Sequence, residues 1–367
     1  MKELKKKIEN RKAIIGVIGL GYVGLPLASN FCSKGYKVIG FDTDVSKVKK
    51  INKGISYIKN FNVKKLKKKI KATNKFSEII YCDVVIICVP TPLKKNNIPD
   101  LSYIKNSITN ILKFVQKGQL IILESTSYPG TTEEEIVNKI KDKKNIGKDI
   151  FVCYSPERED PGNKIFKSTN VPKVISGYTS NCLKVGKTFY KKIFKTLIPV
   201  STIRTAEFTK LLENIYRSVN IGLVNEMKII SKLMNINIHE AIKAASTKPF
   251  GYKAFQPGPG MGGHCIPIDP FYMSWKSKQL GYDPKFIKEA GKINTIIPKW
   301  IVSNIENVLK KKNLQIKKIK ILIIGVAYKK NIDDDRESPA YEIINSLKKK
   351  CFKVTYHDPY IYKISET

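Results

Sequence analysis

Residues 255–270 combine a thiol, an imidazole and a carboxylate with many glycines and prolines. Cys265 is preceded by His264 and followed four positions later by Asp269. Neither helical nor strand periodicity fits this stretch, so we expect an irregular loop whose backbone approaches something closely. A thiolate is a strong nucleophile, which makes Cys265 a candidate for covalent chemistry. A buried structural thiol is the interpretation that we prefer for the other cysteines, Cys32, Cys82, Cys88, Cys153, Cys182 and Cys351.

A second group of residues, near the N-terminus, has the spacing of a dinucleotide-binding turn. Gly19, Gly21 and Gly24 follow the apolar run Ala13–Ile18 and open a helical stretch. Their expected roles are a tight turn, close approach of a pyrophosphate to the backbone, and close packing of helix on strand. Asp42 ends the next strand, where it would accept hydrogen bonds from a ribose 2′-hydroxyl and repel a 2′-phosphate. In this context the alternative, a glycine-rich turn without ligand, is disfavoured, and NAD is predicted over NADP.

Alternating strands and helices must position these residues. The short apolar run Ala13–Ile18 and the segment Tyr36–Asp42 are expected to be the two strands of a βαβ unit. Apolar runs typical of parallel strands buried on both faces follow at Val84–Val89, Leu120–Leu123 and Ile150–Tyr154. This alternation predicts a doubly wound, Rossmann-type α/β domain. From Ala206 to Met234 apolar residues recur at helical steps, which predicts one long amphipathic helix that connects domains or forms a dimer.

A second α/β unit is predicted after Lys320. Strands are expected at Ile321–Ile324 and Val354–Tyr356, both buried on two faces, with a helix at Pro339–Lys350 between them. Only two strands precede the end of the sequence, so we expect this domain to be incomplete. The predicted organisation is a Rossmann-type domain over 1–200, a central helical domain carrying the cysteine loop over 201–312, and a partial α/β domain over 313–367.

The composition argues against several classes of protein. The net charge is +36, but only five of the 67 basic residues are Arg and the Lys residues are spread along the chain, so we do not predict nucleic-acid binding. No apolar run reaches the roughly 18 residues of a membrane span. Seven cysteines without regular spacing favour a reducing cytoplasm, and no metal site is predicted.

Seven motifs in sequence order resemble those of the UDP-glucose/UDP-N-acetylhexosamine dehydrogenase family. They are Gly19-x-Gly21-x-x-Gly24 with Asp42, Val89-Pro90-Thr91-Pro92, Glu124-Ser125-Thr126, Ser155-Pro156-Glu157-Arg158, Ala206-Glu207 with Lys210 and Asn214, Gly262-Gly263-His264-Cys265, and Asp333-Asp334 with Arg336-Glu337-Ser338-Pro339. The resemblance spans nearly the whole chain. It implies oxidation of the C6 hydroxymethyl group of a UDP-sugar to a carboxylate, with two NAD used in sequence, for surface polysaccharide precursors.

The resemblance also implies roles for individual residues. Cys265 would hold the aldehyde as a thiohemiacetal that is oxidised to a thioester. Lys210 and Asn214, four apart on one helix face, would stabilise charge on the C6 oxygen. Without the resemblance, a solvated lysine on a polar helix face is the simpler interpretation of that pair.

The resemblance also implies which residues would contact a catalytic water, the cofactor and the substrate. Asp269 and Thr126 would hold a catalytic water, and Glu157 would act in thioester hydrolysis. The cofactor contacts implied are Gly19, Gly21, Tyr22, Val23, Gly24, Asp42, Lys47, Thr91, Thr126, Lys329 and Arg336. The substrate contacts implied are Glu157, Arg158, Lys210, Asn214, Phe255, Gly258 and Gly262.

The sequence differs from the UDP-glucose branch at Ile268, where that branch carries Lys. Residues 262–270 and 155–162 are instead most similar to the branch that oxidises UDP-N-acetylglucosamine. UDP-glucose and UDP-N-acetylmannosamine remain alternative substrates, as does an inactive fragment that binds only NAD. Dehydrogenases of secondary alcohols, such as the 6-phosphogluconate type, need no thiol, and Cys265 argues against them. We expect a homodimer or higher homo-oligomer in the cytoplasm, with no membrane partner.

Overall fold

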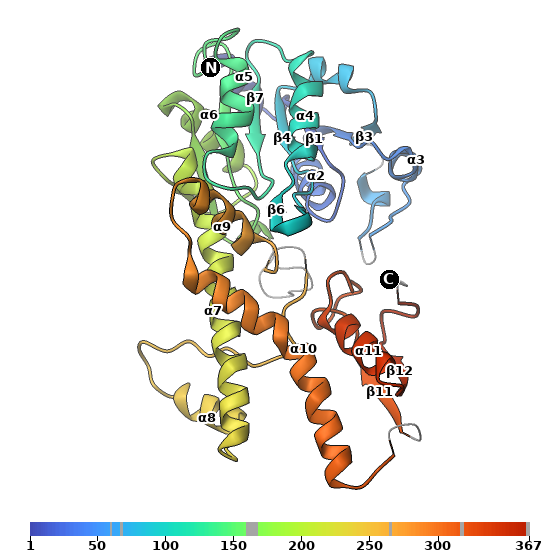
Figure 1. Ribbon diagram of the computed structural model, residues 1–367. Coiled ribbons are helices and arrows are strands. Elements are labelled where there is room, and N and C mark those ends of the chain that lie inside the picture. Colours follow the sequence, from blue (N-terminus) through green and yellow to red (C-terminus); the bar gives the residue numbers. More distant parts are fainter. Residues whose placement is uncertain (59–60, 67–68, 159–167, 264–265, 316–318, 365–367) are drawn as a thin grey trace. The chain divides into compact units, whose positions relative to one another are not determined.

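The computed structural model describes residues 1–58, 61–66, 69–158, 168–263, 266–315 and 319–364 (Figure 1). The chain divides within one helix into an N-terminal unit, Met1–Leu211, and a C-terminal unit, Leu212–Thr367, and each is described by itself. Of the helices in these described stretches, none is both long and apolar enough to cross a membrane.

An eight-stranded sheet forms the centre of the N-terminal unit. Its strands are β1 (Ile14–Ile18), β2 (Lys37–Phe41), β3 (Ile70–Thr73), β4 (Val84–Ile87), β7 (Leu120–Leu123), β8 (Phe151–Tyr154), β9 (Lys173–Gly177) and β10 (Leu197–Pro199). They lie in the order β10-β9-β8-β7-β4-β1-β2-β3, and all neighbouring pairs are parallel except β8 with β9. The strand order reverses between β1 and β4, which is where doubly wound sheets bind ligands. A separate antiparallel pair joins β5 (Leu93–Lys94) to β6 (Ile98–Pro99).

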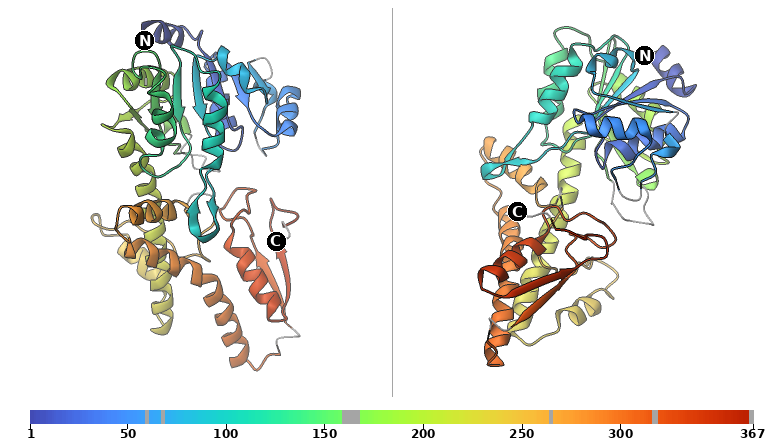
Figure 2. Two further views of the ribbon diagram at one scale, coloured as in Figure 1. Left: turned by 45° about the horizontal axis from the view of Figure 1, so that its top comes forward. Right: turned by 90° about the vertical axis from the view of Figure 1, so that its right-hand side faces the viewer.

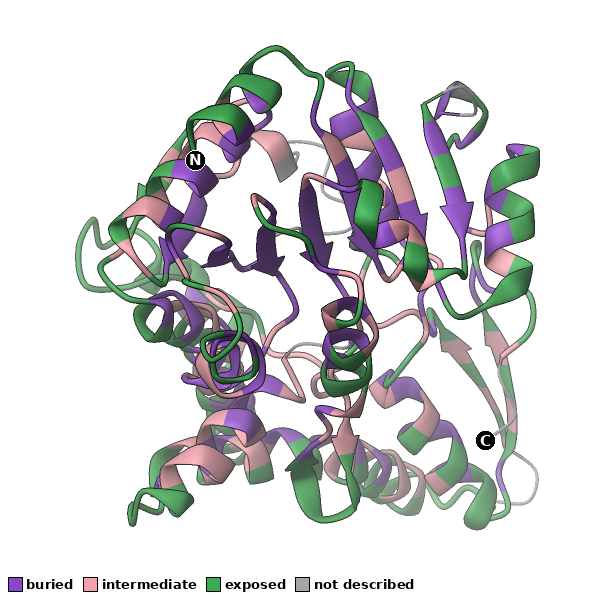
Figure 3. Ribbon diagram, turned by 90° about the horizontal axis from the view of Figure 1, so that it is seen from above, coloured by how far each residue is buried: buried purple, intermediate pink, exposed green. Residues whose placement is uncertain are grey.

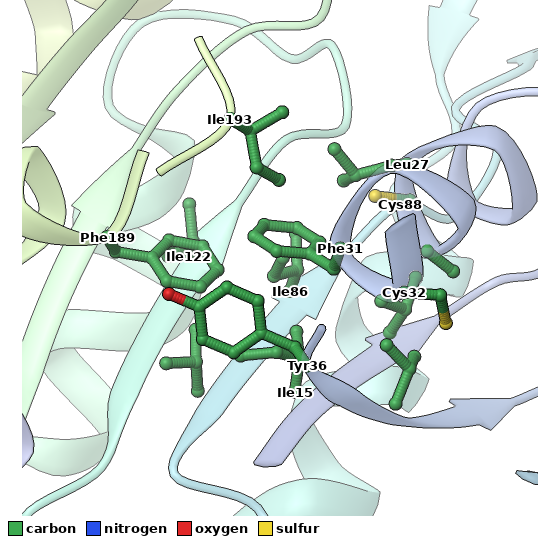
Figure 4. Packing of buried hydrophobic residues seen from close by; sticks show 14 of the residues in the cluster. Ile15, Leu27, Phe31, Cys32, Tyr36, Ile86, Cys88, Ile122, Phe189 and Ile193 are labelled. Carbon is green, nitrogen blue, oxygen red and sulfur yellow. The ribbon is translucent and has the colours of Figure 1, made fainter. Parts of the chain in front are cut away.

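Helices cover both faces of the large sheet. One face carries α1 (Lys2–Glu9), α2 (Gly24–Ser33), α3 (Val45–Lys53) and α6 (Ser180–Tyr190). In its core the rings of Phe31 and Phe189 stack with centroids 4.6 Å apart, over Ile86 and Ile122 (Figure 4). The other face carries α4 (Ser102–Leu112), and α5 (Asn138–Ile140), which continues a π-helical turn, η4 (Glu133–Val137). Because both faces are covered, the central strands are buried throughout, which confirms the prediction from their apolar runs (Figure 3).

Short 3₁₀ turns complete the N-terminal unit: η1 (Lys64–Leu66), η2 (Phe76–Tyr81), η3 (Lys95–Asn97) and η5 (Ser168–Asn170). The predicted long helix is confirmed as α7 (Ile203–Leu233), and the division between the units falls inside it. The C-terminal unit continues with α8 (Ile238–Ala245), α9 (Asp269–Gln279) and α10 (Lys285–Lys311), which the sequence analysis does not predict.

The C-terminal unit ends in a parallel pair of strands, β11 (Lys320–Ile324) and β12 (Lys353–His357), with α11 (Pro339–Lys349) along it (Figure 2). Ile321 and Ile323 pack against α10 and α11. Leu322 and Ile324 point the other way and are 56% and 80% exposed. The prediction that these strands are buried on both faces is therefore wrong, because in the described part of the chain helices cover only one face of the pair.

Candidate active site

The glycine-rich turn is built as a dinucleotide-binding turn requires. Gly19 has φ +88°, and a Cβ there would lie 2.6 Å from the carbonyl oxygen of Cys88. A Cβ on Gly24, which begins α2, would lie 1.9 Å from the carbonyl oxygen of Gly19. A Cβ on Gly21 would have no atom within 4 Å among the described residues, so the backbone there is open to a ligand. The turn thus fits a pyrophosphate at the N-terminus of α2.

Tyr22 and Val23 lie in the same turn, with 42% and 36% of their surface exposed. They precede the first residue of α2 and belong to the part of the turn that is open. Their contact with the cofactor stays a prediction.

Asp42 joins the second strand to the glycine-rich turn. Its Oδ2 accepts a hydrogen bond from the backbone N–H of Leu20 (3.0 Å), and its Oδ1 accepts one from Asp44 (2.9 Å). Each carboxylate oxygen has two lone pairs, so capacity remains for a ribose hydroxyl. The ammonium of Lys47 lies 3.8 Å from Oδ2. A 2′-phosphate at this position would meet a buried carboxylate, which fits NAD better than NADP.

Thr91 and Thr126 lie in loops that follow two neighbouring strands, β4 and β7. Both are half-buried. Ser125 ties the loops together, because its hydroxyl donates to the carbonyl of Val89 at 2.7 Å. The structure therefore places both threonines at the edge of the sheet where the glycine-rich turn contacts Cys88.

Glu157, in the loop after β8, is brought together with Lys210 of α7. The ammonium of Lys210 donates to the backbone carbonyl of Glu157 at 2.7 Å. One carboxylate oxygen of Glu157 accepts from the N–H of Arg158 (2.9 Å) and the other from the ammonium of Lys173 (2.8 Å). Burial alone would raise the pKa of Glu157, but the charges and hydrogen bonds of these neighbours outweigh it and hold the pKa below its ordinary value. Glu157 is thus a carboxylate kept ionised next to a cation.

Sequence reasoning does not single out Lys173, and it names Glu124 only as part of a motif. Lys173 begins β9 and its ammonium also lies 2.8 Å from Glu124, which follows β7. A single Lys at the start of the apolar run that becomes β9 was the available signal, and the abundance of Lys in this chain concealed it.

The C-terminal unit brings two other predicted residues together. The side-chain amide of Asn214, on α7, donates to the carboxylate of Asp269, the first residue of α9. Asn214 is 4% exposed and Asp269 is 2% exposed. Two residues 55 positions apart therefore form a buried polar pair, which combines an amide donor with an acceptor.

Cys265 and His264 lie outside the described residues, but the chain before them is described. Gly263 has φ +87°, and a Cβ there would lie 2.8 Å from the ring of Tyr328. A Cβ on Gly262 would lie 2.7 Å from the Cβ of Tyr328, and the N–H of Gly263 donates to the carbonyl of Arg336 at 3.3 Å. The two glycines are therefore required because their backbone passes against the 328–337 loop.

The earlier part of the cysteine loop is held by buried amides. The N–H of Gly258 donates to the side-chain oxygen of Asn225 at 2.9 Å, and the Asn225 amide donates in turn to Asn294 of α10 at 3.0 Å. The ring of Phe255 packs edge-on against Tyr216, with centroids 5.9 Å apart. The predicted substrate residues Phe255 and Gly258 thus lie in a loop anchored to α7.

Lys329 and Arg336 lie in the loop between β11 and α11. The guanidinium of Arg336 pairs with Asp334 through two bonds, of 2.7 and 2.5 Å. Lys329 is half-buried. The cofactor contacts expected of both residues stay predictions.

Comparison with known proteins agrees with this arrangement. Models of the UDP-glucose/GDP-mannose dehydrogenase family match residues 13–194 (NAD binding domain), 204–296 (central domain) and 322–367 (UDP binding domain). The chain is 35% identical over 356 residues to UDP-N-acetyl-D-mannosamine dehydrogenase of Pyrococcus horikoshii, covering 95% of this chain and 84% of the relative. The chain belongs to the UDP-glucose/GDP-mannose dehydrogenase family.

Two further similarities support the assignment of the dehydrogenase. It is 33% identical over 352 residues to UDP-N-acetyl-D-glucosamine 6-dehydrogenase of Pseudomonas aeruginosa, covering 95% of this chain and 83% of the relative. Its fold matches the solved UDP-D-ManNAc dehydrogenase of Pyrococcus horikoshii with a TM-score of 0.88 at 34% identity, covering 96% of this chain and 85% of that one. The predicted family, fold class and NAD cofactor are confirmed. The predicted domain boundaries and residue roles stay predictions.

Proposed function

We propose that this dehydrogenase oxidises the C6 hydroxymethyl group of UDP-N-acetylglucosamine to a carboxylate through a thioester on Cys265. The observation that carries the proposal is the buried pair of Asn214 and Asp269. An amide donor beside a carboxylate suits a reacting alcohol oxygen and a nearby water. Both residues belong to the unit in which Gly262 and Gly263 lead into Cys265.

The first oxidation converts the alcohol to an aldehyde. NAD, when bound, accepts one hydride in each of the two oxidations. Lys210 uses one N–H on the carbonyl of Glu157, and an ammonium has three, so it retains donors for the developing charge on the C6 oxygen. Asn214 has a second amide N–H for the same oxygen. A water held by Asp269 and Thr126 takes the hydroxyl proton.

The thiolate of Cys265 then adds to the aldehyde carbon, and the aldehyde oxygen becomes an alkoxide. This thiohemiacetal anion loses a second hydride to become a thioester. In the last step water attacks the thioester carbonyl and Glu157 takes one of its protons. The C–S bond breaks, the thiolate leaves, and the uronic acid is released as a carboxylate. The low pKa of Glu157 keeps it in the ionised form that this step needs.

The choice of sugar rests on the sequence around the site. Residues 155–162 and 262–270 resemble the UDP-N-acetylglucosamine branch, which supports that substrate. UDP-N-acetylmannosamine is the second candidate, because several relatives at 35–38% identity carry that name.

A panel of sugars distinguishes the candidates. The protein is incubated with NAD and, separately, UDP-N-acetylglucosamine, UDP-N-acetylgalactosamine, UDP-N-acetylmannosamine and UDP-glucose, while NADH is followed and the product is identified by mass spectrometry. Fastest turnover of UDP-N-acetylglucosamine, with two NADH formed for each uronic acid, supports the proposal. Fastest turnover of UDP-N-acetylmannosamine supports the second candidate, and no NADH from any sugar overturns both.

We also propose that the dehydrogenase forms a homodimer through α7. Large apolar side chains recur along one side of this helix and are 37–80% exposed: Leu212, Tyr216, Leu223, Met227, Ile230 and Leu233. A stripe of this length on a single helix is typical of an interface between copies. The six described cysteines are all thiols, and five are buried, which is compatible with the cytoplasmic location that we predict.

A further inference from the structure

Strand β9 is buried along its whole length, yet it begins with a lysine. Lys173 is 1% exposed. Removing an ammonium from water is very unfavourable unless it is paired and hydrogen-bonded, so the surroundings of Lys173 must supply partners.

The sheet topology explains which partners Lys173 meets. Strand β9 runs antiparallel to β8, so it begins at the edge where β7 and β8 end. Tyr154 pairs with Ser176 in this ladder, and continuing the register places residue 157 opposite residue 173. Glu157 after β8 and Glu124 after β7 therefore both reach the ammonium of Lys173, each at 2.8 Å.

Two aromatic residues complete the enclosure. The hydroxyl of Tyr190 donates to the second carboxylate oxygen of Glu124. The ammonium of Lys173 lies 5.4 Å from the ring centroid of Tyr190 and 5.1 Å from that of Phe194, within the range of cation–π attraction. The ammonium of Lys173 is thus held from several sides.

The pKa values of the two carboxyl groups are shifted in opposite directions. Burial would lower the pKa of Lys173, but the two carboxylates outweigh it and raise that pKa, so Lys173 stays charged. Burial raises the pKa of Glu124 to about 7, whereas the pKa of Glu157 stays below its ordinary value. Glu124 is the more deeply buried of the two and carries a proton more readily, although the ammonium lies 2.8 Å from each carboxyl group.

We propose that Lys173 is a positioning residue for the hydrolytic half of the reaction, where it fixes the carboxylate of Glu157 while Glu124 and Tyr190 fix Lys173. The proposal rests on the proposed function, because it takes Glu157 as the base that receives a proton from the attacking water. That water forms the new C–O bond, the C–S bond to Cys265 breaks, and the second proton leaves from the carboxylic acid to solvent.

The test compares the two halves of the reaction across pH. Among the described residues, the titratable and charged groups that face Glu157 are Lys173 from β9, Glu124 after β7, Cys88 after β4, Tyr190 from α6 and Lys210 from α7. Replacing Lys173 by Met removes the only one of these cations that contacts the carboxylate of Glu157 within the described part of the chain. We expect the acid limb of kcat to move up by about 1–3 pH units, the effect of losing an adjacent opposite charge.

The slow step must also change. In Lys173→Met we expect the first burst of NADH to persist. At pH values below the shifted acid limb, the later steady-state turnover should fall roughly 10- to 100-fold. The thioester should then accumulate on Cys265, where intact-protein mass spectrometry detects it. Lys173→Arg keeps the charge and should return the acid limb of kcat to the pH of the unaltered protein. Lys195→Met, the same change at an exposed position, should leave the pH of that limb unchanged.

A second variant protects the test against misfolding. Lys173→Met leaves two buried carboxyl groups without the cation that contacts both. The double variant Glu124→Leu, Lys173→Met replaces one buried pair by apolar groups, which is often neutral for stability. The double variant should show the same shift of the acid limb. If a folded, active variant shows neither a shift of the acid limb nor an accumulated thioester, the proposed role of Lys173 is overturned and the proposed function is not affected. No NADH from any UDP-sugar with the unaltered protein would instead overturn the proposed function, and this inference with it.

Discussion

The carboxylate of Glu207, in the first turns of α7, accepts hydrogen bonds from both the backbone N–H (2.8 Å) and the hydroxyl (2.7 Å) of Thr132. Its second oxygen accepts from the N–H of Gly130 at 2.5 Å. Glu207 therefore fastens α7 to the loop that leads from Thr126 into η4. The attachment is fully buried within the N-terminal unit, which makes it sensitive to ionisation.

Glu207 should make stability depend on pH. Burial raises its pKa from 4.5 to about 7, although the hydrogen bonds from Thr132 and Gly130 oppose that rise. Stability from a raised pKa is complete below the unfolded value and is lost as pH rises through the folded value, here on the order of 3 kcal/mol. Relative to Glu207→Gln, the unaltered protein should therefore lose unfolding free energy as pH rises from 4.5 to about 7 in urea titrations. Glu240→Gln, at an exposed position of α8, is the control, and parallel curves for the protein and Glu207→Gln would contradict the prediction.

Asp42 should set the preference for NAD. The unaltered protein should turn over with NAD and not with NADP, and Asp42→Ala should narrow the ratio of the two kcat/KM values. Asp42→Ala also leaves the buried N–H of Leu20 without its acceptor, at about 1–3 kcal/mol, and removes the acceptor of the part-buried N–H of Asp44. Asp42→Asn keeps an acceptor and removes the charge, so it separates preference from stability. Equal use of both cofactors by the unaltered protein would be incompatible with this role.

Cys265 should be essential for acid formation. Cys265→Ser should stop net formation of uronic acid, because Ser is a poor nucleophile at neutral pH and an ester hydrolyses differently from a thioester. Cys265→Ala should remove covalent capture altogether. NADH formation and the intact mass of the protein report both effects, and Cys351→Ser, at an exposed thiol, serves as the control. Normal turnover by Cys265→Ala would rule out covalent catalysis.

The apolar stripe of α7 should hold two copies together. Leu223 is 54% exposed near the middle of the stripe, and Leu223→Asp would place a charge inside the proposed interface. Sedimentation equilibrium should then show a dimer for the unaltered protein and a monomer for the variant. Arg217→Asp, exposed on another side of the same helix, should stay dimeric. A monomeric unaltered protein would refute the interface.

The sequence predicts those strands whose apolar residue pattern matches their burial in the folded protein. Val84–Ile87 and Leu120–Leu123 are apolar because both faces of their sheet are covered, so their residue types alone indicate their place. The same reasoning fails for Ile321–Ile324, since an apolar run carries no information on how many faces other elements cover. The prediction also passed over α10, whose apolar residues lie among many lysines.

The candidate site shows a similar limit. The pairing of Asn214 with Asp269 followed from neither spacing nor periodicity, because 55 residues separate them and only the tertiary fold brings Asn214 of α7 to the first residue of α9. The contacts of Lys173 are harder still to predict from the sequence. Its role depends on the antiparallel register of β9 with β8, which places it opposite residue 157 and which no local pattern of residues encodes.

The three glycines of the dinucleotide turn would follow different evolutionary fates if the chain ever lost its cofactor. Gly19 and Gly24 are held by the chain itself, since any side chain on them would collide with Cys88 or with Gly19. Gly21 faces no atom within 4 Å among the described residues, so only the ligand forbids a side chain there. A descendant that stopped binding NAD would therefore keep Gly19 and Gly24 and accumulate substitutions at position 21. A substitution at position 21 alone would then indicate that NAD binding had been lost.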